Sequence, residues 1–266
     1  MKGGEKKELS LYGTDDGVRA VGNPVRRHIL LLLRDGEVCF ESIVASSGRA
    51  KSTISAHLSA LADEGIIGSH PGDEDERKKY FFLRSHYLGE LSPADRISDD
   101  LGTYAEGYRE GAADPFSLYR LIYRTFRVSL LTEGISIDPL LRETGETVGR
   151  AVYPAVAADT LPAFTDNLSA FFERHHLGHI DEVAPDPITF SVYDCFECVE
   201  LPILGKPACS FETGFISALF SFQLRQPVDA VELECYAAGD PRCRFEIRDA
   251  GPEKNLYRDL PPQNQV

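Results

Sequence analysis

Five of the six cysteines lie near the carboxyl end of the 266-residue sequence. They fall within 49 residues, at Cys195, Cys198, Cys209, Cys235 and Cys243, whereas Cys39 stands apart. Thiolates are soft metal ligands and are also the reactive form of cysteine in disulfide exchange. We therefore expect metal or redox chemistry in this region, rather than the disulfide framework that is typical of small secreted chains.

Four residues of this region could hold one metal ion: Cys209, Glu232, Cys235 and Cys243. Three thiolates and one carboxylate complete a tetrahedral shell around zinc. Cys235 lies near the predicted end of a strand, and Cys243 follows after a turn at residues 237–241. That turn would return the chain and bring both sulfurs to one ion. The spacing lacks the doubled Cys-x-x-Cys of a zinc ribbon, so unrelated buried thiols are the alternative.

Cys195 and Cys198 form a separate Cys-x-x-Cys pair. Such a pair can close a reversible disulfide or supply further metal ligands. It does not follow a βαβ pattern of the thioredoxin type, and two structural thiols are the remaining alternative. We treat the pair as a redox candidate.

The elements that begin the chain describe a winged helix-turn-helix over residues 1–88. Asn23 and Pro24 are typical of a helix N-terminus, and Gly36 and Gly65 are typical of helix ends. The predicted elements are helices at 23–35, 40–45 and 51–64, followed by strands at 66–68 and 77–83 around a polar loop. Helix, helix, turn, helix and hairpin in this order is a compact unit for binding duplex DNA.

The third of these helices is predicted to be the recognition helix. Ile54, Leu58 and Leu61 share one face, so the opposite face is free to meet base edges and phosphates. The DNA-contacting candidates are Arg49, Lys51, Ser52, Thr53, Ser55, Ala56 and His57, with Arg77, Lys78 and Lys79 in the wing. A solvated serine-rich helix face is the alternative, and the wing cations could instead pair with the neighbouring acidic residues 73–76.

The net charge of −14 does not exclude DNA binding. Residues 1–88 carry 13 basic and 13 acidic residues, and the rest of the chain carries 15 and 29, so the whole acidic excess lies outside the predicted winged helix. Only a local basic face could therefore meet phosphate.

Residues 115–250 are predicted to form an α+β sensor domain. A connecting or dimerisation helix is expected at 89–114, and a loose tail at 251–266. The expected helices of the domain lie at 116–131, 139–148, 161–174 and 213–223, and its strands at 188–193, 230–236 and 243–248.

The composition favours a soluble, cytoplasmic protein that is not an enzyme. Residues 1–8 are polar and lysine-rich, unlike a secretory signal, and no apolar run approaches the roughly 18 residues of a membrane-spanning helix. The sequence has no phosphate-binding glycine loop, nucleophile elbow or His-Glu-x-x-His motif.

The run from Lys51 to Leu58, followed by Leu61 and Gly65-Ile66-Ile67, resembles the recognition helix and wing entry of ArsR-type winged-helix repressors. The resemblance covers about residues 15–88 and implies a repressor that binds a double-stranded operator as a homodimer. Ala50 and Ala56 depart from the usual capping and polar residues. Cys39 fills only one of two cysteine positions that metal-sensing members can carry, so we expect it to be a small core residue.

Residues 195–248 resemble the 4-vinyl-reductase-type sensor domain, and the similarity extends back to about Phe116. The motifs are Lys206 to Gly214 and Glu232 to Phe245. In aromatic-sensing activators with this domain, three cysteines and a glutamate hold zinc, and the four candidate ligands match that pattern. Joined to an ArsR-like winged helix, the domain resembles the methanogen-specific redox regulators of archaea, in which cysteine oxidation alters operator binding.

The alternative function is a regulator that responds to a small aromatic molecule and uses zinc only for structure. The residues that could line its pocket are Phe116, Tyr119, Tyr123, Phe126 and Phe164. Aromatic residues at helical spacing are also common in an ordinary core.

Overall fold

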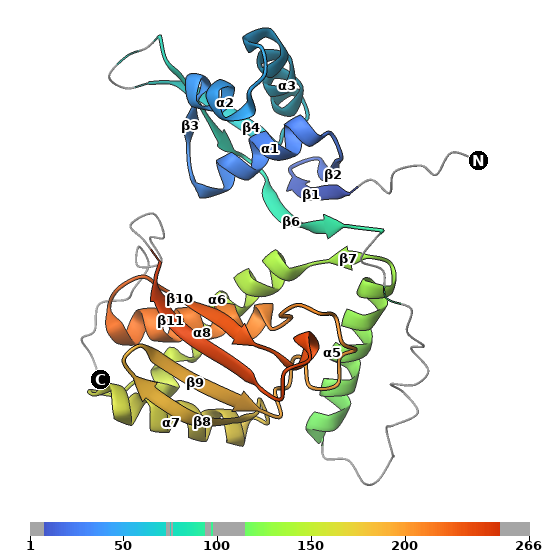
Figure 1. Cartoon of the computed structure of the whole chain (residues 1–266). Coiled ribbons are helices and arrows are strands. Elements are labelled where there is room, and N and C mark those ends of the chain that lie inside the picture. Colours follow the sequence, from blue (N-terminus) through green and yellow to red (C-terminus); the bar gives the residue numbers. More distant parts are fainter. Residues whose placement is uncertain (1–7, 73–74, 76, 94–96, 98–114, 251–266) are drawn as a thin grey trace. The chain divides into compact units, whose positions relative to one another are not determined.

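A computed structural model describes residues 8–72, 75, 77–93, 97 and 115–250 (Figure 1). The chain divides into two compact units. The amino-terminal unit contains residues 1–96 and 133–137, and the carboxyl-terminal unit contains residues 97–132 and 138–266. Among the described helices, none combines the length and apolar character that a membrane crossing requires. The predicted tail at 251–266 lies outside the described residues.

The amino-terminal unit contains the predicted winged helix-turn-helix. Its helices are α1 (Pro24–Leu32), α2 (Phe40–Ser47) and α3 (Lys51–Asp63), and its wing consists of β4 (Ile67–Pro71) and β5 (Lys79–Leu83). A short strand, β3 (Val38–Cys39), completes a sheet of order β3-β5-β4. The predicted N-cap is confirmed, because the Asn23 side chain accepts hydrogen bonds from the backbone N–H groups of Val25 and Arg26.

The buried face of α3 fixes which of its residues meet solvent. Ile54, Leu58 and Leu61 are at most 2% exposed and belong to the core that Ile29 of α1 and Ile43 of α2 also form. Burying three such side chains contributes roughly 1.5–3 kcal/mol each. The helix is therefore held in one rotation about its axis, with its polar side outward.

A second sheet in this unit was not predicted. It has the order β2-β1-β6-β7 and consists of β1 (Leu9–Thr14), β2 (Gly17–Val21), β6 (His86–Leu91) and β7 (Ile135–Ser136). The predicted connecting helix is wrong at 89–91, which belong to β6, and its residues 98–114 lie outside the described part. Gly89 has a φ of +152°, and a Cβ there would lie 2.0 Å from the Ser136 carbonyl oxygen. The unit thus extends beyond residue 88 and takes its last strand from much later in the chain.

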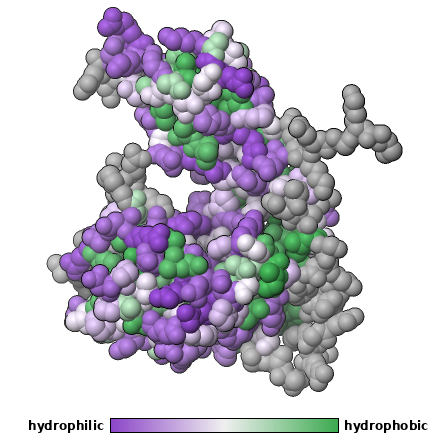
Figure 2. Space-filling model, in the orientation of Figure 1, coloured by the Kyte–Doolittle hydropathy of each residue, from purple (hydrophilic) through white to green (hydrophobic). Residues whose placement is uncertain are grey.

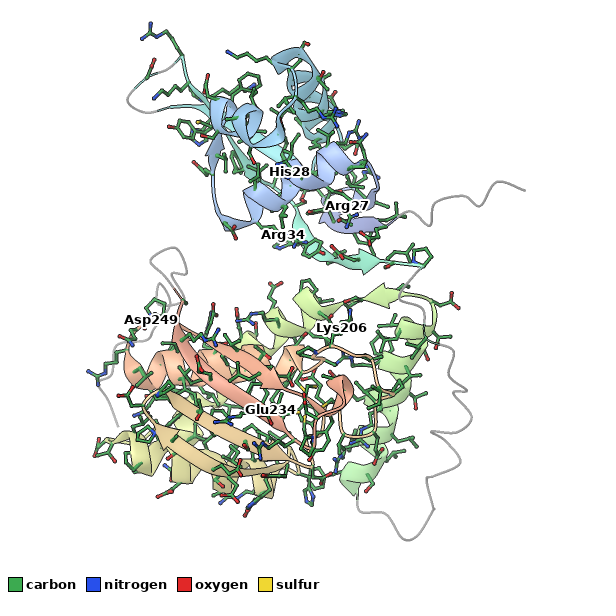
Figure 3. All side chains as sticks on the ribbon, viewed as in Figure 1. Arg27, His28, Arg34, Lys206, Glu234 and Asp249 are labelled. Atoms are coloured by element: carbon green, nitrogen blue, oxygen red, sulfur yellow. The ribbon has the colours of Figure 1, made fainter. Side chains whose placement is uncertain are left out.

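Arginines of α1 and of the turn after it tie this part of the unit to the second sheet (Figure 3). Arg27 pairs with Glu8 at 2.8 Å and with Glu90 of β6 at 3.7 Å. The Arg34 guanidinium lies 3.2 Å from the centroid of the Tyr87 ring, a cation–π contact. These contacts make β1 and β6 part of the same folded unit as the three helices.

The carboxyl-terminal unit has the predicted α+β architecture. Its antiparallel sheet has the order β10-β11-β9-β8, with β8 (His179–Pro185), β9 (Ile188–Tyr193), β10 (Val228–Glu234) and β11 (Cys243–Asp249). Its helices are α5 (Pro115–Thr132), α6 (Asp138–Val156), α7 (Leu161–Arg174) and α8 (Ser210–Leu224). Figure 1 shows α6, α7 and α8 on one face of this sheet.

Three details of this unit differ from the predictions. Helix α6 continues to Val156 instead of ending at residue 148, and it contains Pro154. Strand β8 was not predicted, because only Ile180 among its seven residues is buried and the strand lacks an apolar pattern. Tyr236 belongs to the one-turn helix η2 (Tyr236–Ala238) rather than to β10.

Helix α8 is buried from Glu212 to Phe222, because α6 packs against it at backbone distance. A Cβ on Gly145 of α6 would lie 2.0 Å from the Phe211 carbonyl oxygen, and one on Gly214 of α8 would lie 2.0 Å from that of Arg142. Glycine at these positions is therefore what allows the two helices to approach so closely.

We expect Gly145→Ala to destabilise the carboxyl-terminal unit by about 3 kcal/mol, the upper range for overpacking a close-packed core. The added methyl group meets backbone atoms, which cannot move aside as a flexible side chain can. Urea denaturation monitored by circular dichroism measures this change. Glu143→Ala, at an exposed position of the same helix, is the control. Equal midpoints for the two variants would contradict the close helix contact.

Candidate metal centre and nucleic-acid interface

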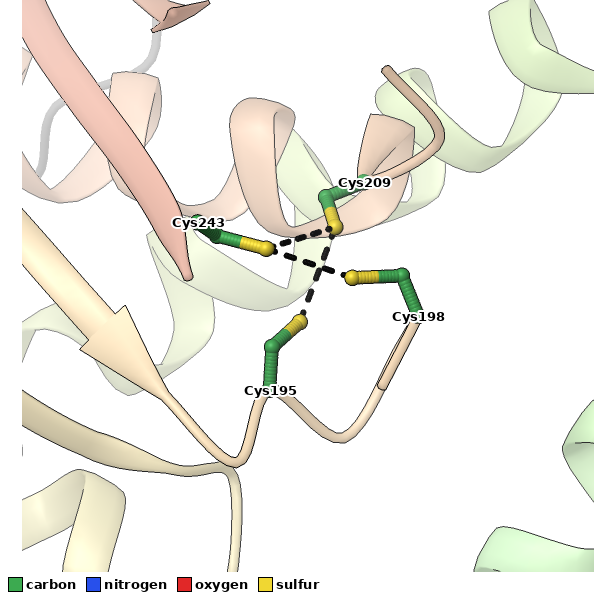
Figure 4. Close-up of side chains that lie close together, drawn as sticks. All are labelled: Cys195, Cys198, Cys209 and Cys243. Atoms are coloured by element: carbon green, nitrogen blue, oxygen red, sulfur yellow. Dashed lines mark hydrogen bonds between the residues drawn. The ribbon is translucent and has the colours of Figure 1, made fainter. Parts of the chain in front are cut away.

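Five cysteine sulfurs converge in the core of the carboxyl-terminal unit. Cys195 and Cys198 lie in the loop after β9, Cys209 is the N-cap residue of α8, Cys235 follows β10, and Cys243 begins β11. Each is at most 1% exposed. Figure 4 shows four of them with their side chains pointing toward one another. Residues spread over 49 positions of the sequence thus form one buried cluster, which we call the cysteine cluster.

The distances within the cysteine cluster suit the shell of a single metal ion. Sγ of Cys209 lies 3.5 Å from that of Cys195, 3.7 Å from that of Cys243 and 3.9 Å from that of Cys235. Sγ of Cys198 lies 3.2 Å from that of Cys243 and 3.7 Å from that of Cys235. A tetrahedral ion with metal–sulfur bonds of about 2.3 Å has sulfur–sulfur edges of about 3.8 Å. The observed spacing therefore fits a thiolate-bound ion.

Two carboxylates beside the cluster have oxygen atoms left over for a cation. Glu232 accepts a hydrogen bond from the Cys209 backbone N–H through Oε2, at 3.1 Å. Glu212 accepts one from the Cys195 thiol through Oε2, also at 3.1 Å. The Oε1 atom of each is buried and has no hydrogen-bond partner among the described residues. Unsatisfied buried oxygens are costly, so a bound cation would account for them.

Burial dominates the acid–base properties of these groups. It raises the pKa of Glu232 to about 9, and it raises the pKa values of Glu212 and of the Cys209 thiol well above their usual range. A carboxylate or thiolate loses its hydration in such a place. A divalent cation would reverse this effect, because it favours the deprotonated ligands and releases their protons on binding.

The structure brings the predicted metal ligands together. The ligand atoms of Cys209, Glu232, Cys235 and Cys243 all lie within 4.8 Å of one another. The same is true of a second set in which Cys195 and Cys198 take the places of Glu232 and Cys235. The pair that we predicted to be separate therefore belongs to the same cluster. Sequence reasoning missed Glu212 and Glu197, which a helix N-terminus and a neighbouring loop bring to the cysteines.

Glu197 positions the loop that carries Cys195 and Cys198. This carboxylate is completely buried and accepts hydrogen bonds from the backbone N–H groups of Phe211 and Glu212 in the first turn of α8. The Arg127 guanidinium donates to it at 2.9 Å. Both oxygens of Glu197 have partners, so this residue anchors the loop, and its carboxylate also lies within 4.8 Å of the ligand atoms of Cys209 and Glu212.

Three arginines on one face of α5 hold the same loop. Arg127 pairs with Glu197, Arg120 with Asp194 at 3.1 Å, and Arg124 with Glu200. The arginines lie at i, i+4 and i+7, so they share one side of the helix. The three acidic partners surround Cys195 and Cys198 along the chain. Helix α5 therefore fixes the position of this part of the cysteine cluster.

The five aromatic residues suggested for a small-molecule pocket have separate surroundings. Phe164 is completely buried and packs edge-on against Phe220. Tyr119 is 69% exposed and Phe126 54% exposed, on an apolar part of the surface over α5 (Figure 2). Tyr123 instead donates a hydrogen bond to Glu197. Phe164 lies on α7 and the other four residues lie along one side of α5, so a single pocket lined by all five stays a prediction.

The outward face of α3 carries the DNA-contacting candidates. Seven residues from the start of this helix were proposed, and all except His57 are exposed: Arg49, Lys51, Ser52, Thr53, Ser55 and Ala56. His57 is half-buried. No side chain caps the helix at Ala50, so backbone N–H groups of its first turn stay available. A phosphate of the DNA backbone beside the groove could accept hydrogen bonds from these N–H groups.

The wing offers two exposed lysines. Lys78, Lys79 and Arg77 are all exposed, and Arg77 pairs with Asp75 at 3.1 Å while its side chain stays 92% exposed. Because a pair this exposed is weak, Arg77 stays a candidate for contact with phosphate. Cys39 is half-buried and contacts the Ser42 hydroxyl at 3.1 Å, so it is not the fully buried core residue that was expected.

Comparisons with known proteins agree with this division of the chain. Residues 23–69 match the model described as bacterial regulatory protein, arsR family, and residues 188–249 match the model of the vinyl-4-reductase domain. The predicted fold, an amino-terminal ArsR-type helix-turn-helix followed by an α+β domain of the vinyl-4-reductase type, is thereby confirmed. The matches join a DNA-binding helix-turn-helix of the arsR type to a domain of the vinyl-4-reductase type in one chain.

Relatives occur in Methanocaldococcus jannaschii. One uncharacterized protein is 37% identical over 81 residues, which are 30% of this chain and 50% of that protein. A second is 28% identical over 130 residues, 48% of this chain and 73% of that protein. The chain thus spans half of the first relative's length.

Two solved structures are similar to parts of the chain. A vinyl-4-reductase family protein from Methanocaldococcus jannaschii is 16% identical with a TM-score of 0.35, covering 57% of this chain and 89% of that one. The phenol-responsive sensory domain of the transcription activator PoxR, solved with phenol, is 15% identical with a TM-score of 0.32, covering 74% and 90%.

Proposed function

We propose that this protein is a redox-responsive transcription regulator that binds operator DNA as a homodimer and releases it on oxidation. The observation that carries the proposal is the convergence of five buried cysteines in a chain that also has an ArsR-type helix-turn-helix. A regulator needs a sensor whose chemistry changes with the signal. A cluster of thiols is such a sensor, because its oxidation changes bonds, charge and metal binding together.

DNA would be bound by α3 and the wing. Ser52, Thr53 and Ser55 lie on the outward face of the helix, where small hydroxyl side chains allow close approach to base edges. Arg49 and Lys51 at its start, with Lys78 and Lys79 in the wing, would contact phosphates. Two copies would place two such helices on half-sites about one helical turn apart.

Zinc is the metal that this donor set suits best. Cys209, Cys235 and Cys243 with Glu232 would hold it, as their mutual distances allow. When bound, the ion supplies charge compensation for thiolates that the core would otherwise keep protonated. The role of the protein is to hold these ligands in a water-excluded place until an oxidant reaches them.

Oxidation by hydrogen peroxide would convert two metal-bound thiolates of the cluster into a disulfide. The thiolates lose two electrons, and hydrogen peroxide takes up these electrons and two protons to become two molecules of water. A sulfur in a disulfide is no longer a thiolate ligand, so the ion is released. The resulting change in the sensor domain would alter the spacing of the two recognition helices, and with it the affinity for paired half-sites.

Operator binding by reduced and peroxide-oxidised full-length protein tests the proposal. A duplex selected from a random pool by the reduced protein serves as the operator, at one salt concentration throughout. We expect oxidation to weaken binding about tenfold or more, in the range usual for allosteric coupling. Cys39→Ser should respond like the wild type, and Lys51→Ala should weaken binding in both states.

Equal affinities of the reduced and oxidised proteins would overturn the redox role. In that case, a rise in melting temperature when an aromatic compound is added to the reduced protein would favour a regulator that responds to small molecules.

A further inference from the structure

We infer that the cysteine cluster contains two overlapping coordination sets for one ion, and that the ion can pass between them while Cys209 and Cys243 stay bound. One set uses Glu232 and Cys235, and the other uses Cys195 and Cys198. The inference deepens the proposed function and rests on its metal site.

The first ground is a surplus of donors. A tetrahedral ion takes four ligands, and structural zinc sites are almost always closed with four. The cluster offers five thiols, together with the free oxygens of Glu232 and Glu212. Two four-member sets that share only the pair of Cys209 and Cys243 meet the distance requirement. The distances also admit Cys198 and Cys235 together with the same pair. The two shared Sγ atoms are 3.7 Å apart, which is the sulfur–sulfur distance expected when both bind one tetrahedral ion.

The second ground is that the donors surround one position and not two. If Cys209 and Cys243 bridged two ions, the other ligands of the two ions would lie on opposite sides of this pair of sulfurs. However, Sγ of Cys198, from one set, lies only 3.7 Å from Sγ of Cys235, from the other. That distance is again a single tetrahedral edge of about 3.8 Å. The two sets therefore compete for one ion.

The third ground is the origin of each ligand in the fold. Cys209 is the N-cap residue of the buried helix α8, and Cys243 is the first residue of β11, which has a strand neighbour on each side, so long regular elements position the shared ligands. Cys195 and Cys198 lie in a loop that follows β9, and Cys235 lies between the end of β10 and the one-turn helix η2. Of the ligands that exchange, Cys195, Cys198 and Cys235 therefore lie outside the strands, whereas Glu232 lies in β10.

The exchange is also balanced in charge and protons. When the ion moves to the all-sulfur set, the Cys195 and Cys198 thiols give up two protons and coordinate. The Cys235 thiolate and the Glu232 carboxylate leave the ion and take up two protons. Both shells contain four anionic ligands, so no net charge enters or leaves the buried site. The low-polarity surroundings therefore do not oppose the exchange.

Metal binding by full-length, reduced variants tests this inference. Cys235→Ser and Glu232→Gln disrupt only the mixed set, Cys198→Ser disrupts only the all-sulfur set, and Cys209→Ser disrupts both. Each protein is loaded with one equivalent of Zn²⁺ or Co²⁺, and its affinity is measured by competition with a chelator. For Co²⁺, the intensity of the sulfur-to-cobalt charge-transfer band reports the number of bound thiolates.

We expect Cys198→Ser and Cys235→Ser each to retain one ion per chain with affinity within about tenfold of the wild type, and Cys209→Ser to bind about 100-fold more weakly or worse. Cys235→Ser should give the more intense four-thiolate cobalt band and Cys198→Ser the three-thiolate band. Cys39→Ser, outside the cluster, is the matched control. If Cys235→Ser fails to fold by circular dichroism, Glu232→Gln replaces it.

If Cys198→Ser or Cys235→Ser folds but loses the ion as completely as Cys209→Ser does, only one of the two sets binds metal. That result would overturn the inference. The operator-binding response of the wild type to peroxide would be untouched by that result. A wild-type chain that binds neither ion would overturn both this inference and the metal part of the proposed function.

Discussion

Removing the metal from the reduced protein should lower the melting temperature of the carboxyl-terminal unit by about 10 °C, since each kcal/mol shifts it by roughly 2–4 °C in a unit of this size. An ion present at about 1,000 times its dissociation constant stabilises the folded state by about 4 kcal/mol. Glu212 and Glu232 lie beside the sulfurs and add further acidic groups to the cluster, so the ion supplies charge compensation where it is most needed. Differential scanning calorimetry with and without a chelator measures the effect.

The loss of melting temperature on metal removal should depend on pH in a defined direction. Burial raises the pKa values of Glu232 and Cys209, so protons compete with the metal for these ligands. Metal binding displaces those protons and therefore strengthens as the pH rises. The difference in melting temperature between metal-bound and metal-free protein should shrink as the pH falls. A chelator-treated protein that melts at the same temperature as the untreated one would contradict a structural role for the ion.

The parts of the fold that the sequence predicted well are those with local signals. Asn23 and Pro24 marked the start of α1, and the spacing of Ile54, Leu58 and Leu61 gave the buried face of α3. Strand β7 has only two residues and pairs with β6 from a distant part of the chain. Its existence depends on a partner that no local pattern identifies, which is why the boundary at residue 88 was placed too early.

The sequence predicted which residues belong to the site but not how they contact one another. Resemblance and ligand chemistry gave Cys209, Glu232 and Cys235 as neighbours, and the structure brings them together. The Cys-x-x-Cys spacing gave no sign that Cys198 would lie 3.2 Å from Cys243, because that contact is set by the path of the loop between β9 and α8. The residues that anchor this loop are arginines of α5, some 70 residues earlier in the chain. Arginines at this spacing are equally typical of a solvated helix face, so the sequence did not indicate that they anchor the loop.

Arg127→Met should destabilise the carboxyl-terminal unit by roughly 3–5 kcal/mol, the cost of leaving one member of a buried ion pair uncompensated. Arg127 is 4% exposed and Glu197 is completely buried, so solvent cannot replace the lost partner. The substitution also removes the hydrogen bond from the guanidinium to the Ala208 carbonyl, at 2.7 Å. Urea denaturation of the metal-bound, reduced protein measures the loss.

Arg120→Met is the matched control on the same face of α5. Its partner Asp194 is 68% exposed in its side chain, so water can solvate that carboxylate, and the expected cost is below about 1 kcal/mol. A loss in Arg127→Met no larger than in Arg120→Met would contradict the anchoring role of Glu197.

The double variant Arg127→Met with Glu197→Gln separates charge burial from packing. The neutral amide no longer needs a cation, and its oxygen can still accept a hydrogen bond from the first turn of α8, where Glu197 accepts from Phe211 and Glu212. We therefore expect the double variant to be more stable than Arg127→Met alone, a coupling that contacting residues show and distant ones do not. If the Glu197 charge holds the loop against α5 and α8 together, Cys195 and Cys198 should no longer be fixed beside Cys209 and Cys243 in the double variant. The ion should then be held as in Cys198→Ser, by Cys209, Cys243 and the remaining mixed-set ligands.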